Sequence, residues 1–189
     1  MNQDPRKVAV LIGSLRKESI NRRLALAVAK LAPPRFTFEH IAIGDLPLYN
    51  QDRDNSPTEQ AQRLKREIEA ADALLFVTPE YNRSVPGVLK NAIDIASRPY
   101  GKNSFAGKPG GVIGASIGAV GTAVSQLHLR TILAYLDIPT LGQPEAYIQF
   151  TDGLIDDAGA VGNDKTRAFL QSWVDRYVSW VDTIASAPR

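Results

Sequence analysis

Residues 8–31 contain the pattern that most limits how this chain can fold. Residues 8–12 form a short apolar run rich in β-branched side chains, which indicates a buried strand. The run ends at Gly13, and a polar loop then leads into a helical pattern that includes Leu24 and Val28. A strand that delivers such a loop to a helix N-terminus leaves free backbone N–H groups at the positive end of the helix dipole. The segment therefore predicts an anion site.

The polar side chains of this loop suit a phosphate group. Ser14, Ser19 and Asn21 carry hydrogen-bond donors, and Arg16 adds a permanently charged guanidinium. An ordinary turn in which a serine or asparagine only caps the helix explains the same pattern, so both interpretations stay open on this evidence alone. The glycine-rich dinucleotide fingerprint and the P-loop are absent after the strand. The lack of cysteine excludes a thiol nucleophile.

Strand and helix patterns alternate along the rest of the chain. Strands are expected at residues 8–12, 36–43, 73–77 and 110–115, with a split last strand at 139–141 and 147–150. Helices are expected at residues 21–31, around Leu64, Ile68 and Ala71, at 86–96, before Leu136 and at 165–184, where Trp173 and Tyr177 should be core residues. This alternation predicts one α/β domain over residues 1–189, a five-stranded parallel sheet with helices on both faces. The flavodoxin-like strand order 2-1-3-4-5 fits it, with ligand expected at the carboxyl ends of strands one and three.

Composition narrows the function classes. The chain has 189 residues, of which 44% are hydrophobic and 22% charged, as in an ordinary globular protein. No apolar run approaches the roughly 18 residues of a membrane span, no signal-peptide pattern opens the chain, and the absence of cysteine suits a reducing cytoplasm. His40 and His128 lie far apart, so no metal site is expected, and His40 on its predicted strand should be structural. The net charge is only +2 and the arginines are dispersed, so nucleic-acid binding is not expected.

Three loops should meet at the carboxyl edge of the sheet, and their sequences together resemble one known family. The first reads GSLRKESINRRLA, and the second reads TPEYNRSVP before a helix that contains LKNAID. The third belongs to SRPYGKNSFAGKPGGVIGAS, and HLRTILAYLDIP and PEAYI follow. In this order, from about residue 7 to residue 150, these segments resemble the NADPH-dependent FMN reductases, a family that includes chromate and quinone reductases. Two positions differ from many relatives, which have Trp in place of Ile95 and Pro in place of Ile117.

The resemblance implies a set of cofactor-binding residues. The residues that hold the FMN phosphate would be Ser14, Arg16, Ser19, Ile20 and Asn21. The residues along the isoalloxazine ring would be Pro79, Glu80, Tyr81 and Asn82, with Ser116 and Gly118 nearby. A flavin ring needs backbone donors and a flat surface, and Pro79 and Pro86 restrict the loop that would supply them. The Glu80 side chain is expected to be solvated because an unpaired carboxylate would repel a reduced flavin. Tyr81 either covers the ring or simply packs.

The resemblance implies an FMN-dependent oxidoreductase that takes hydride from NADPH or NADH. The electrons would pass to a small acceptor such as a quinone, free flavin, azo compound or metal oxyanion such as chromate. No catalytic acid or base and no metal are assigned. The alternative is a flavodoxin-like electron carrier without its own NAD(P)H oxidation. We expect a homodimer or homotetramer, with no nucleic-acid or membrane partner. Residues 44–57, which carry an apolar patch at Leu46, Pro47, Leu48 and Tyr49, would cover the flavin of a neighbouring chain.

Overall fold

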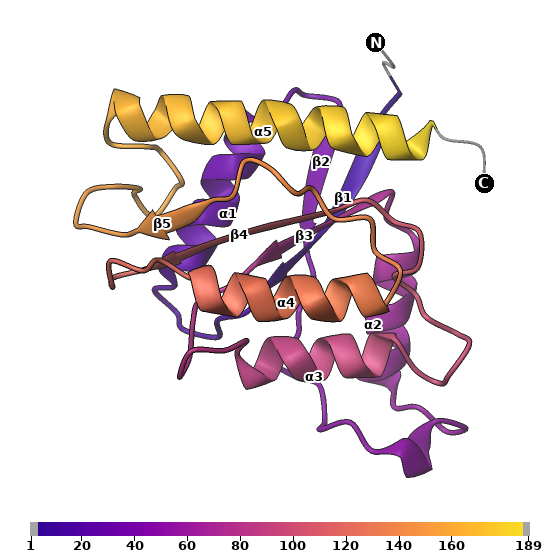
Figure 1. The fold of residues 1–189 in the computed structure, drawn as a ribbon. Helices are drawn as coiled ribbons and strands as arrows, with labels where there is room; N and C mark the ends of the chain where they lie inside the picture. Colours follow the sequence, from indigo (N-terminus) through magenta and orange to yellow (C-terminus); the bar gives the residue numbers. More distant parts are fainter. Residues whose placement is uncertain (1–3, 187–189) are drawn as a thin grey trace.

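The computed structural model describes residues 4–186, which form one parallel sheet between two helical layers (Figure 1). The elements in chain order are β1 (Arg6–Ile12), α1 (Ile20–Leu31), β2 (Phe36–His40), the 3-10 turn η1 (Gln51–Arg53), α2 (Glu59–Glu69), β3 (Ala73–Val77), α3 (Gly87–Ala96), β4 (Gly110–Ser116), α4 (Ala123–Tyr135), β5 (Tyr147–Gln149) and α5 (Asp164–Ala185). The strands pair in the order β2-β1-β3-β4-β5, all parallel. The predicted flavodoxin-like α/β fold is therefore confirmed.

The central strands are apolar on both faces because helices cover both. Every residue of β3 is buried, and its side chains alternate between the two layers. Leu75 and Val77 pack with α1 and α5, whereas Leu74 and Phe76 pack with α2, α3 and α4. Because both faces are closed in this way, ligands are left with the edges of the sheet.

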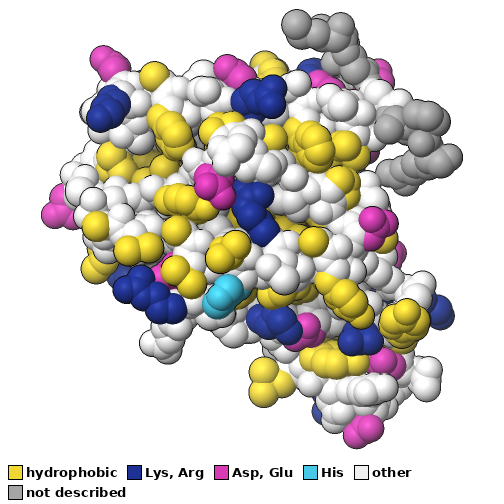
Figure 2. All heavy atoms as spheres, viewed as in Figure 1, with side chains coloured by type: hydrophobic (Ala, Val, Ile, Leu, Met, Phe, Trp, Pro, Cys, Tyr) yellow, Lys and Arg dark blue, Asp and Glu magenta, His cyan; other side chains and the backbone are white. Residues whose placement is uncertain are grey.

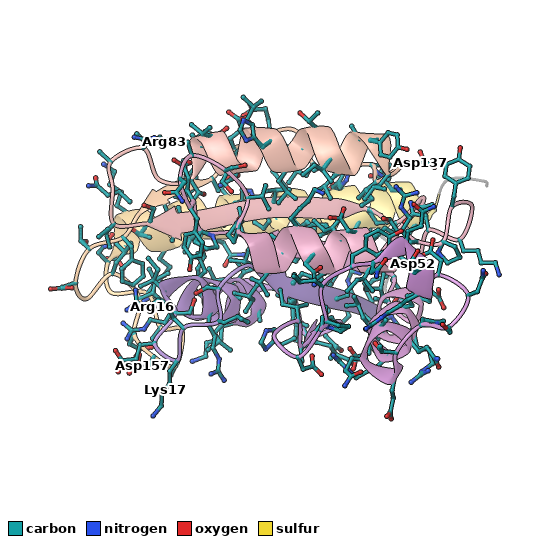
Figure 3. All side chains as sticks on the ribbon, turned by 90° about the horizontal axis from the view of Figure 1, so that it is seen from below. Arg16, Lys17, Asp52, Arg83, Asp137 and Asp157 are labelled. Atoms are coloured by element: carbon teal, nitrogen blue, oxygen red, sulfur yellow. The ribbon has the colours of Figure 1, made fainter. Side chains whose placement is uncertain are left out.

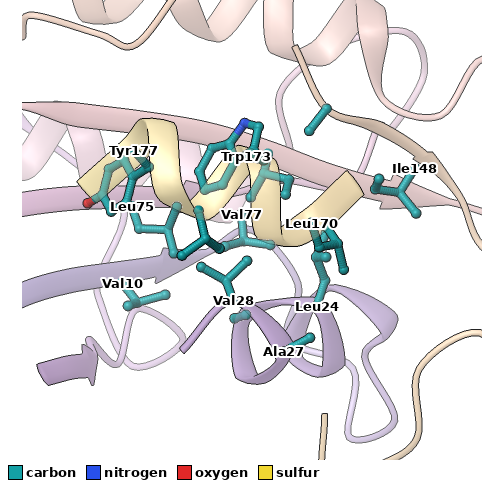
Figure 4. Packing of buried hydrophobic residues seen from close by; sticks show 14 of the residues in the cluster. Val10, Leu24, Ala27, Val28, Leu75, Val77, Ile148, Leu170, Trp173 and Tyr177 are labelled. Atoms are coloured by element: carbon teal, nitrogen blue, oxygen red, sulfur yellow. The ribbon is translucent and has the colours of Figure 1, made fainter. Parts of the chain in front are cut away.

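Helix α5 is fixed by two aromatic side chains, as Figure 4 shows. Trp173 and Tyr177 are buried and stacked, with ring centroids 5.4 Å apart and an interplanar angle of 13°, so their predicted core role is confirmed. The Tyr177 hydroxyl donates to the Leu74 carbonyl oxygen at 2.9 Å. Burial raises the pKa of Tyr177 far above its ordinary value, which keeps the hydroxyl neutral. Gly111 permits this packing because a Cβ there would lie 2.7 Å from the Tyr177 ring.

Several predicted boundaries shift. The second strand ends at His40 instead of residue 43, because the chain leaves the sheet after the Ile41 N–H donates to the Val10 carbonyl oxygen; Ile41 and Ile43 are nevertheless buried. Ala71 lies beyond the end of α2 and is buried there. The split last strand is confirmed in outline, since Thr140 forms an isolated bridge with Gly110 before β5 begins. Within residues 4–186, none of the helices is both long and apolar enough to span a membrane.

Candidate active site

The loop between β1 and α1 ends in a capped helix whose first N–H groups remain available. The Ser19 side chain and carbonyl oxygen accept from the Arg22 N–H, and the same carbonyl accepts from the Arg23 N–H. Among the described residues, the N–H groups of residues 17–21 have no hydrogen-bond partner. These donors lie at the positive end of the α1 dipole, so the loop presents a backbone site for an anion.

Asn21 has a positioning role that the sequence did not reveal. Its side-chain Nδ2 donates to the Ala115 carbonyl oxygen and its Oδ1 accepts from the Ala115 N–H, both at 2.9 Å. The side chain is buried, and the two hydrogen bonds tie the first turn of α1 to β4. Its side chain therefore holds the helix in place, and its backbone N–H remains available to an anion.

The loop after β3 contains a tight β-hairpin with a two-residue turn. Tyr81 and Ser84 exchange backbone hydrogen bonds at 3.1 and 3.0 Å, and Asn82 and Arg83 have φ angles of 50° and 62°. Two successive positive φ angles define a type I′ turn, which asparagine tolerates but arginine adopts rarely. Within the part of the chain that the structure describes, the N–H groups of Asn82 and Arg83 have no partner. The turn thus offers two further backbone donors, in addition to those of residues 17–21.

The expectation that the Glu80 side chain is solvated is wrong. The side chain is 7% exposed, and Oε2 accepts from the N–H groups of Val124 and Ser125 at 3.0 and 3.1 Å. Oε1 accepts from the Arg83 guanidinium at 3.0 Å. Thr122, the residue at the N-cap of α4, makes no side-chain capping bond, so Glu80 caps that helix from a different loop. The carboxylate charge is offset by the helix dipole and Arg83.

A buried polar network beneath the hairpin was also missed. The hydroxyls of Thr78 and Ser125 donate to the Pro79 carbonyl oxygen at 2.7 and 3.0 Å. The Gln126 Nε2 donates to the Thr122 hydroxyl and to the Ala146 carbonyl oxygen, both at 2.8 Å. Ser125 lies at helical spacing from the buried Leu129 and Leu133, and that spacing was the signal for a polar group on the buried side of α4. The network fixes the second loop to α4.

Two glycines let the loops approach the sheet closely. A Cβ on Gly114 would lie 2.2 Å from both the Thr122 hydroxyl and the Thr78 carbonyl oxygen. A Cβ on Gly13 would lie 3.1 Å from the Pro79 ring. Neither position has room for a larger side chain without movement of a loop.

The structure gathers the predicted site residues in two hollows at the carboxyl edge. A hollow of about 340 Å³ lies between the second and third loops and includes Glu80, Asn82, Ser116 and Gly118. A hollow of about 290 Å³ includes Ser14, Arg16 and Ser19. Ile20 and Asn21 follow at the start of α1, Pro79 is buried beside Gly13, and Tyr81 is 47% exposed. Figure 3 shows Arg16 and Arg83 at the same end of the molecule.

In the third loop the Ser116 hydroxyl accepts from the Gly118 N–H at 3.1 Å. The side chain of Ile117, the residue between them in the sequence, is exposed. No group of three acidic or histidine side chains that could hold a metal ion occurs among residues 4–186. The arrangement therefore consists of backbone donors and hydroxyls on the loops after β1, β3 and β4, which suits binding and orientation rather than acid–base catalysis.

Comparisons with known proteins agree with this site. Residues 6–152 match the family model for NADPH-dependent FMN reductase. The chain is 53% identical over 175 residues to a 2-hydroxy-1,4-benzoquinone reductase from Burkholderia sp, a match that covers 93% of this chain and 96% of the relative. It is 43% identical over 179 residues to an NAD(P)H-dependent FMN reductase from Pseudomonas aeruginosa. That match covers 94% of this chain and 96% of the relative.

The solved structures include a similar enzyme. FerB from Paracoccus denitrificans, described as a flavoenzyme NAD(P)H:(acceptor) oxidoreductase, superposes with a TM-score of 0.90 at 47% identity, over 94% of this chain and 98% of FerB. The family match covers more than half of the chain, and the relatives are matched over nearly their whole length. The chain belongs to the NADPH-dependent FMN reductase family.

Proposed function

We propose that this protein is an FMN-dependent NAD(P)H oxidoreductase that delivers electrons to a small quinone-type acceptor. The observation that carries the proposal is two sets of backbone donors, on neighbouring loops, that have no partner among residues 4–186. The N–H groups of residues 17–21 follow β1, and those of Asn82 and Arg83 follow β3. β1 and β3 are paired, and the winding of the sheet reverses between them, which is where this fold binds ligands.

The residues present fit FMN. One donor set at a helix N-terminus suits a terminal phosphate, and Ser14, Arg16, Ser19, Ile20 and Asn21 would hold it. The hairpin and third loop would border the ring through Pro79, Glu80, Tyr81, Asn82, Ser116 and Gly118. Bound FMN supplies the redox chemistry, taking hydride from a reduced nicotinamide and passing electrons to the acceptor.

The chain's own contribution is binding, orientation and charge placement. The fixed N–H groups of the hairpin provide dipoles that favour an electron-rich ring. Glu80 does not oppose this effect, because its carboxylate is already held by α4 and Arg83. The buried hydroxyls of Thr78 and Ser125 restrain the loop that carries those donors. No side chain is assigned to proton transfer.

Anaerobic mixing tests the enzyme class. The protein should hold about one FMN per chain, and excess NADPH or NADH should bleach its absorbance without a second protein. A flavodoxin-like carrier would need a separate reductase, so a flavin that stays oxidised with both nucleotides would overturn the proposal. Binding of FAD instead of FMN would contradict the assignment of the first loop as a terminal-phosphate site.

Quinones are the favoured acceptor because the benzoquinone reductase from Burkholderia sp is among the relatives. A steady-state screen at fixed NADPH should therefore give the highest kcat/KM with a benzoquinone. The same screen should include free flavin, an azo compound and chromate as the other acceptors. A higher kcat/KM for any of these would replace the quinone in this proposal.

We further propose a homo-oligomer in which residues 44–57 cover a neighbour's flavin. Asn91 on α3 holds this segment, since Oδ1 accepts from the Tyr49 N–H at 2.8 Å and Nδ2 donates to the Pro47 carbonyl oxygen at 2.9 Å. Figure 3 shows Asp52 at the end opposite Arg16 and Arg83, so η1 lies far from its own chain's site. Leu48 is 83% exposed beside it.

The face formed by α3 and α4 is the surface through which a second copy would bring this segment to the site. Hydrophobic side chains are interspersed over that face in Figure 2, and Leu127 and Tyr135 of α4 are 62% and 76% exposed. Light scattering at micromolar concentration should give a multiple of 20.6 kDa. A fully active monomer would contradict the shared site.

The proposed compartment is the cytoplasm, since a chain without cysteine needs no oxidising environment. The proposed partners are small molecules, without a nucleic-acid or membrane surface.

A further inference from the structure

A third hollow, of about 490 Å³, lies apart from the two hollows at the carboxyl edge. It is bordered by residues 47–58, by α2 and by the loop that follows α3, and it shares no lining residue with the other two. Figure 3 shows Asp52, which precedes one of its lining residues, at the opposite end of the molecule from Arg16 and Arg83. Its volume falls within the range of ligand sites, about 300–1,000 Å³. We call this feature the α2 hollow.

Hydrogen bonds hold the walls of the α2 hollow together. Lys65 Nζ, on α2, donates to three carbonyl oxygens within residues 96–102 at 3.0, 2.8 and 2.7 Å. Asn91, on α3, accepts from the Tyr49 N–H and donates to the Pro47 carbonyl oxygen. The three segments are therefore fixed relative to one another, and a ligand would not have to order them when it binds.

The charged lining of the α2 hollow is mostly cationic. The cations are Arg53, Lys65, Arg66, Arg98 and Lys102, and the acids are Asp54 and Glu69. Lys65 is engaged by the carbonyl oxygens described above, but none of the other four cations forms an ion pair among residues 4–186. The acids have other partners, since Asp54 accepts from the Tyr49 hydroxyl and Glu69 from the Ser104 hydroxyl. Four cations therefore remain available to an anion.

The α2 hollow also has apolar surfaces, some of them flat. Its lining includes the rings of Pro47, Tyr49 and Pro99 together with the side chain of Ile95. Arg98 and Pro99 are both half-buried, so a guanidinium and a flat ring lie next to each other in the lining. A small inorganic anion would leave these apolar surfaces in contact with water, whereas a flat organic body would cover them.

We propose that the α2 hollow binds a planar organic anion, an aromatic or quinonoid ring that carries a carboxylate, sulfonate or enolate group. Arg98 contacts the negative group, because it is the half-buried member of the four available cations and a partly desolvated guanidinium binds an anion more strongly than an exposed one. Arg53 and Lys102, which are exposed, add attraction from a longer distance. This site goes beyond the proposed function, since none of its lining residues is assigned to FMN.

Isothermal titration calorimetry with a matched pair of probes tests the assignment. The protein is first saturated with FMN, so that the flavin site cannot take the probe. Naphthalene-2-sulfonate should bind at one site per chain, and its uncharged counterpart naphthalene-2-sulfonamide should bind about tenfold more weakly or worse. Arg98→Gln should weaken sulfonate binding about tenfold, the effect of a lost hydrogen bond to a charged group, and change sulfonamide binding less than about twofold.

Two further variants show whether the effect belongs to this hollow. Arg98→Lys keeps the charge but not the planar donor geometry, so it should restore part of the sulfonate affinity. Arg176→Gln removes an exposed guanidinium from α5, outside the hollow, and should leave the affinity unchanged. The thermal midpoint of Arg98→Gln should match that of the wild-type protein, because Arg98 forms no ion pair among residues 4–186.

Four results would overturn the proposal. Equal affinities for the sulfonate and the sulfonamide would leave the cations without a role, and inorganic sulfate that binds as tightly as naphthalene-2-sulfonate would leave the apolar surfaces without one. Sulfonate binding that is the same in wild type and Arg98→Gln would place the probe elsewhere, and release of FMN by the probe would place it at the flavin site. The titrations involve no electron transfer, so a failure of NAD(P)H oxidation would refute the proposed function and leave this inference standing.

Discussion

The carboxyl and amino edges of the sheet differ in whether their polar groups find hydrogen-bond partners within the protein. At the amino edge, Lys65 Nζ donates to the carbonyl oxygens of Ala96, Arg98 and Lys102 at 3.0, 2.8 and 2.7 Å. These bonds satisfy the end of α3 and the loop that follows it. At the carboxyl edge, the N–H groups of residues 17–21 remain without partners among the described residues. A hollow of about 490 Å³ lies beside Lys65, Arg98 and Lys102, but the polar groups named here are closed by hydrogen bonds within the protein. The carboxyl edge leaves its backbone donors open to a ligand.

This difference between the edges predicts which residues contribute to the stability of the fold and which contribute to ligand binding. The guanidinium of Arg35 makes a bidentate contact with Asp182 near the end of α5, with bonds of 3.1 and 2.6 Å, and stacks over Phe36 at 4.6 Å. By contrast, the arginine in the hairpin of the carboxyl edge adopts a positive φ angle, and its side chain is 69% exposed. A substitution at the amino edge should therefore change unfolding, and one at the carboxyl edge should change cofactor or substrate binding.

The largest expected effect is at the closed edge. Asp182→Ala would leave Arg35 and Arg6, both mostly buried, without their counter-charge. Loss of one partner of a buried pair costs about 3–5 kcal/mol, and the partial exposure of this pair favours the lower end, about 3 kcal/mol. Urea unfolding should show this loss while the FMN dissociation constant stays constant. Asp175→Ala, which removes an exposed carboxylate from the same helix, is the control. A parallel loss of FMN affinity in the folded variant would remove the distinction between the edges.

The second prediction applies to the open edge. Arg16→Ala should weaken FMN binding by roughly 1.5–3 kcal/mol, the range for hydrogen bonds to charged groups, and leave the stability of the apoprotein nearly unchanged. Fluorescence titration with FMN measures the first quantity, and urea unfolding measures the second. When resaturated with FMN, the variant should recover most of its turnover, because Arg16 holds the cofactor without touching the reacting atoms. An unchanged dissociation constant would show that the phosphate lies elsewhere.

Glu80 lies at the carboxyl edge but also caps a helix, so its substitution should affect both stability and FMN binding. The effect should be smaller than those of the first two variants. Glu80→Gln keeps the volume of the side chain but removes the charge that caps α4 and pairs with Arg83. We expect a loss of about 1 kcal/mol in unfolding free energy, the usual range for a partly buried charge at a helix N-terminus, together with weaker FMN binding. Glu59→Gln, at the exposed first turn of α2, should lose only a few tenths of that value. Equal effects of the two variants would mean that Glu80 has no special role.

These residues also show how far the sequence could predict the structure. The strands, the helix caps and the meeting of three loops follow from local patterns such as the continuous apolar run of β3 and the serine before α1. The partner of a polar side chain does not follow, because it depends on contacts between distant segments. Asn21 binds a backbone 94 positions away, and Glu80 binds the start of α4 44 positions away. The sequence therefore predicted them as candidate site residues, through the family resemblance, without the hydrogen bonds that determine their orientation.

The route of residues 44–57 was unpredictable for a related reason. Its apolar cluster indicated a covering segment, but the attachment to Asn91 and the turn η1 place it at the far end of its own chain. The folded arrangement adds that this segment lies far from its own chain's candidate site, and the cover over a neighbouring chain's flavin stays a prediction.

The smallest expected effect concerns His40, at the border of the open edge. Its pKa is lowered, first by burial and then by Arg22, so the folded protein disfavours the protonated ring. Because the folded pKa lies below the unfolded value of about 6.5, the contribution to stability is present above pH 6.5 and is lost as the pH falls through the folded pKa. The side chain is exposed to solvent, which screens the charge, so the effect on stability should be the smallest of those predicted, and His40→Gln should remove it.

Nuclear magnetic resonance titration gives the direct measurement of that pKa. The sequence has only two histidines, so His128→Gln assigns both ring signals. His40 should titrate below its ordinary value in the wild-type protein, and Arg22→Gln should raise its pKa because one of the two causes is removed. A His40 pKa that is the same in the wild-type protein and in Arg22→Gln would show that Arg22 does not affect this ring.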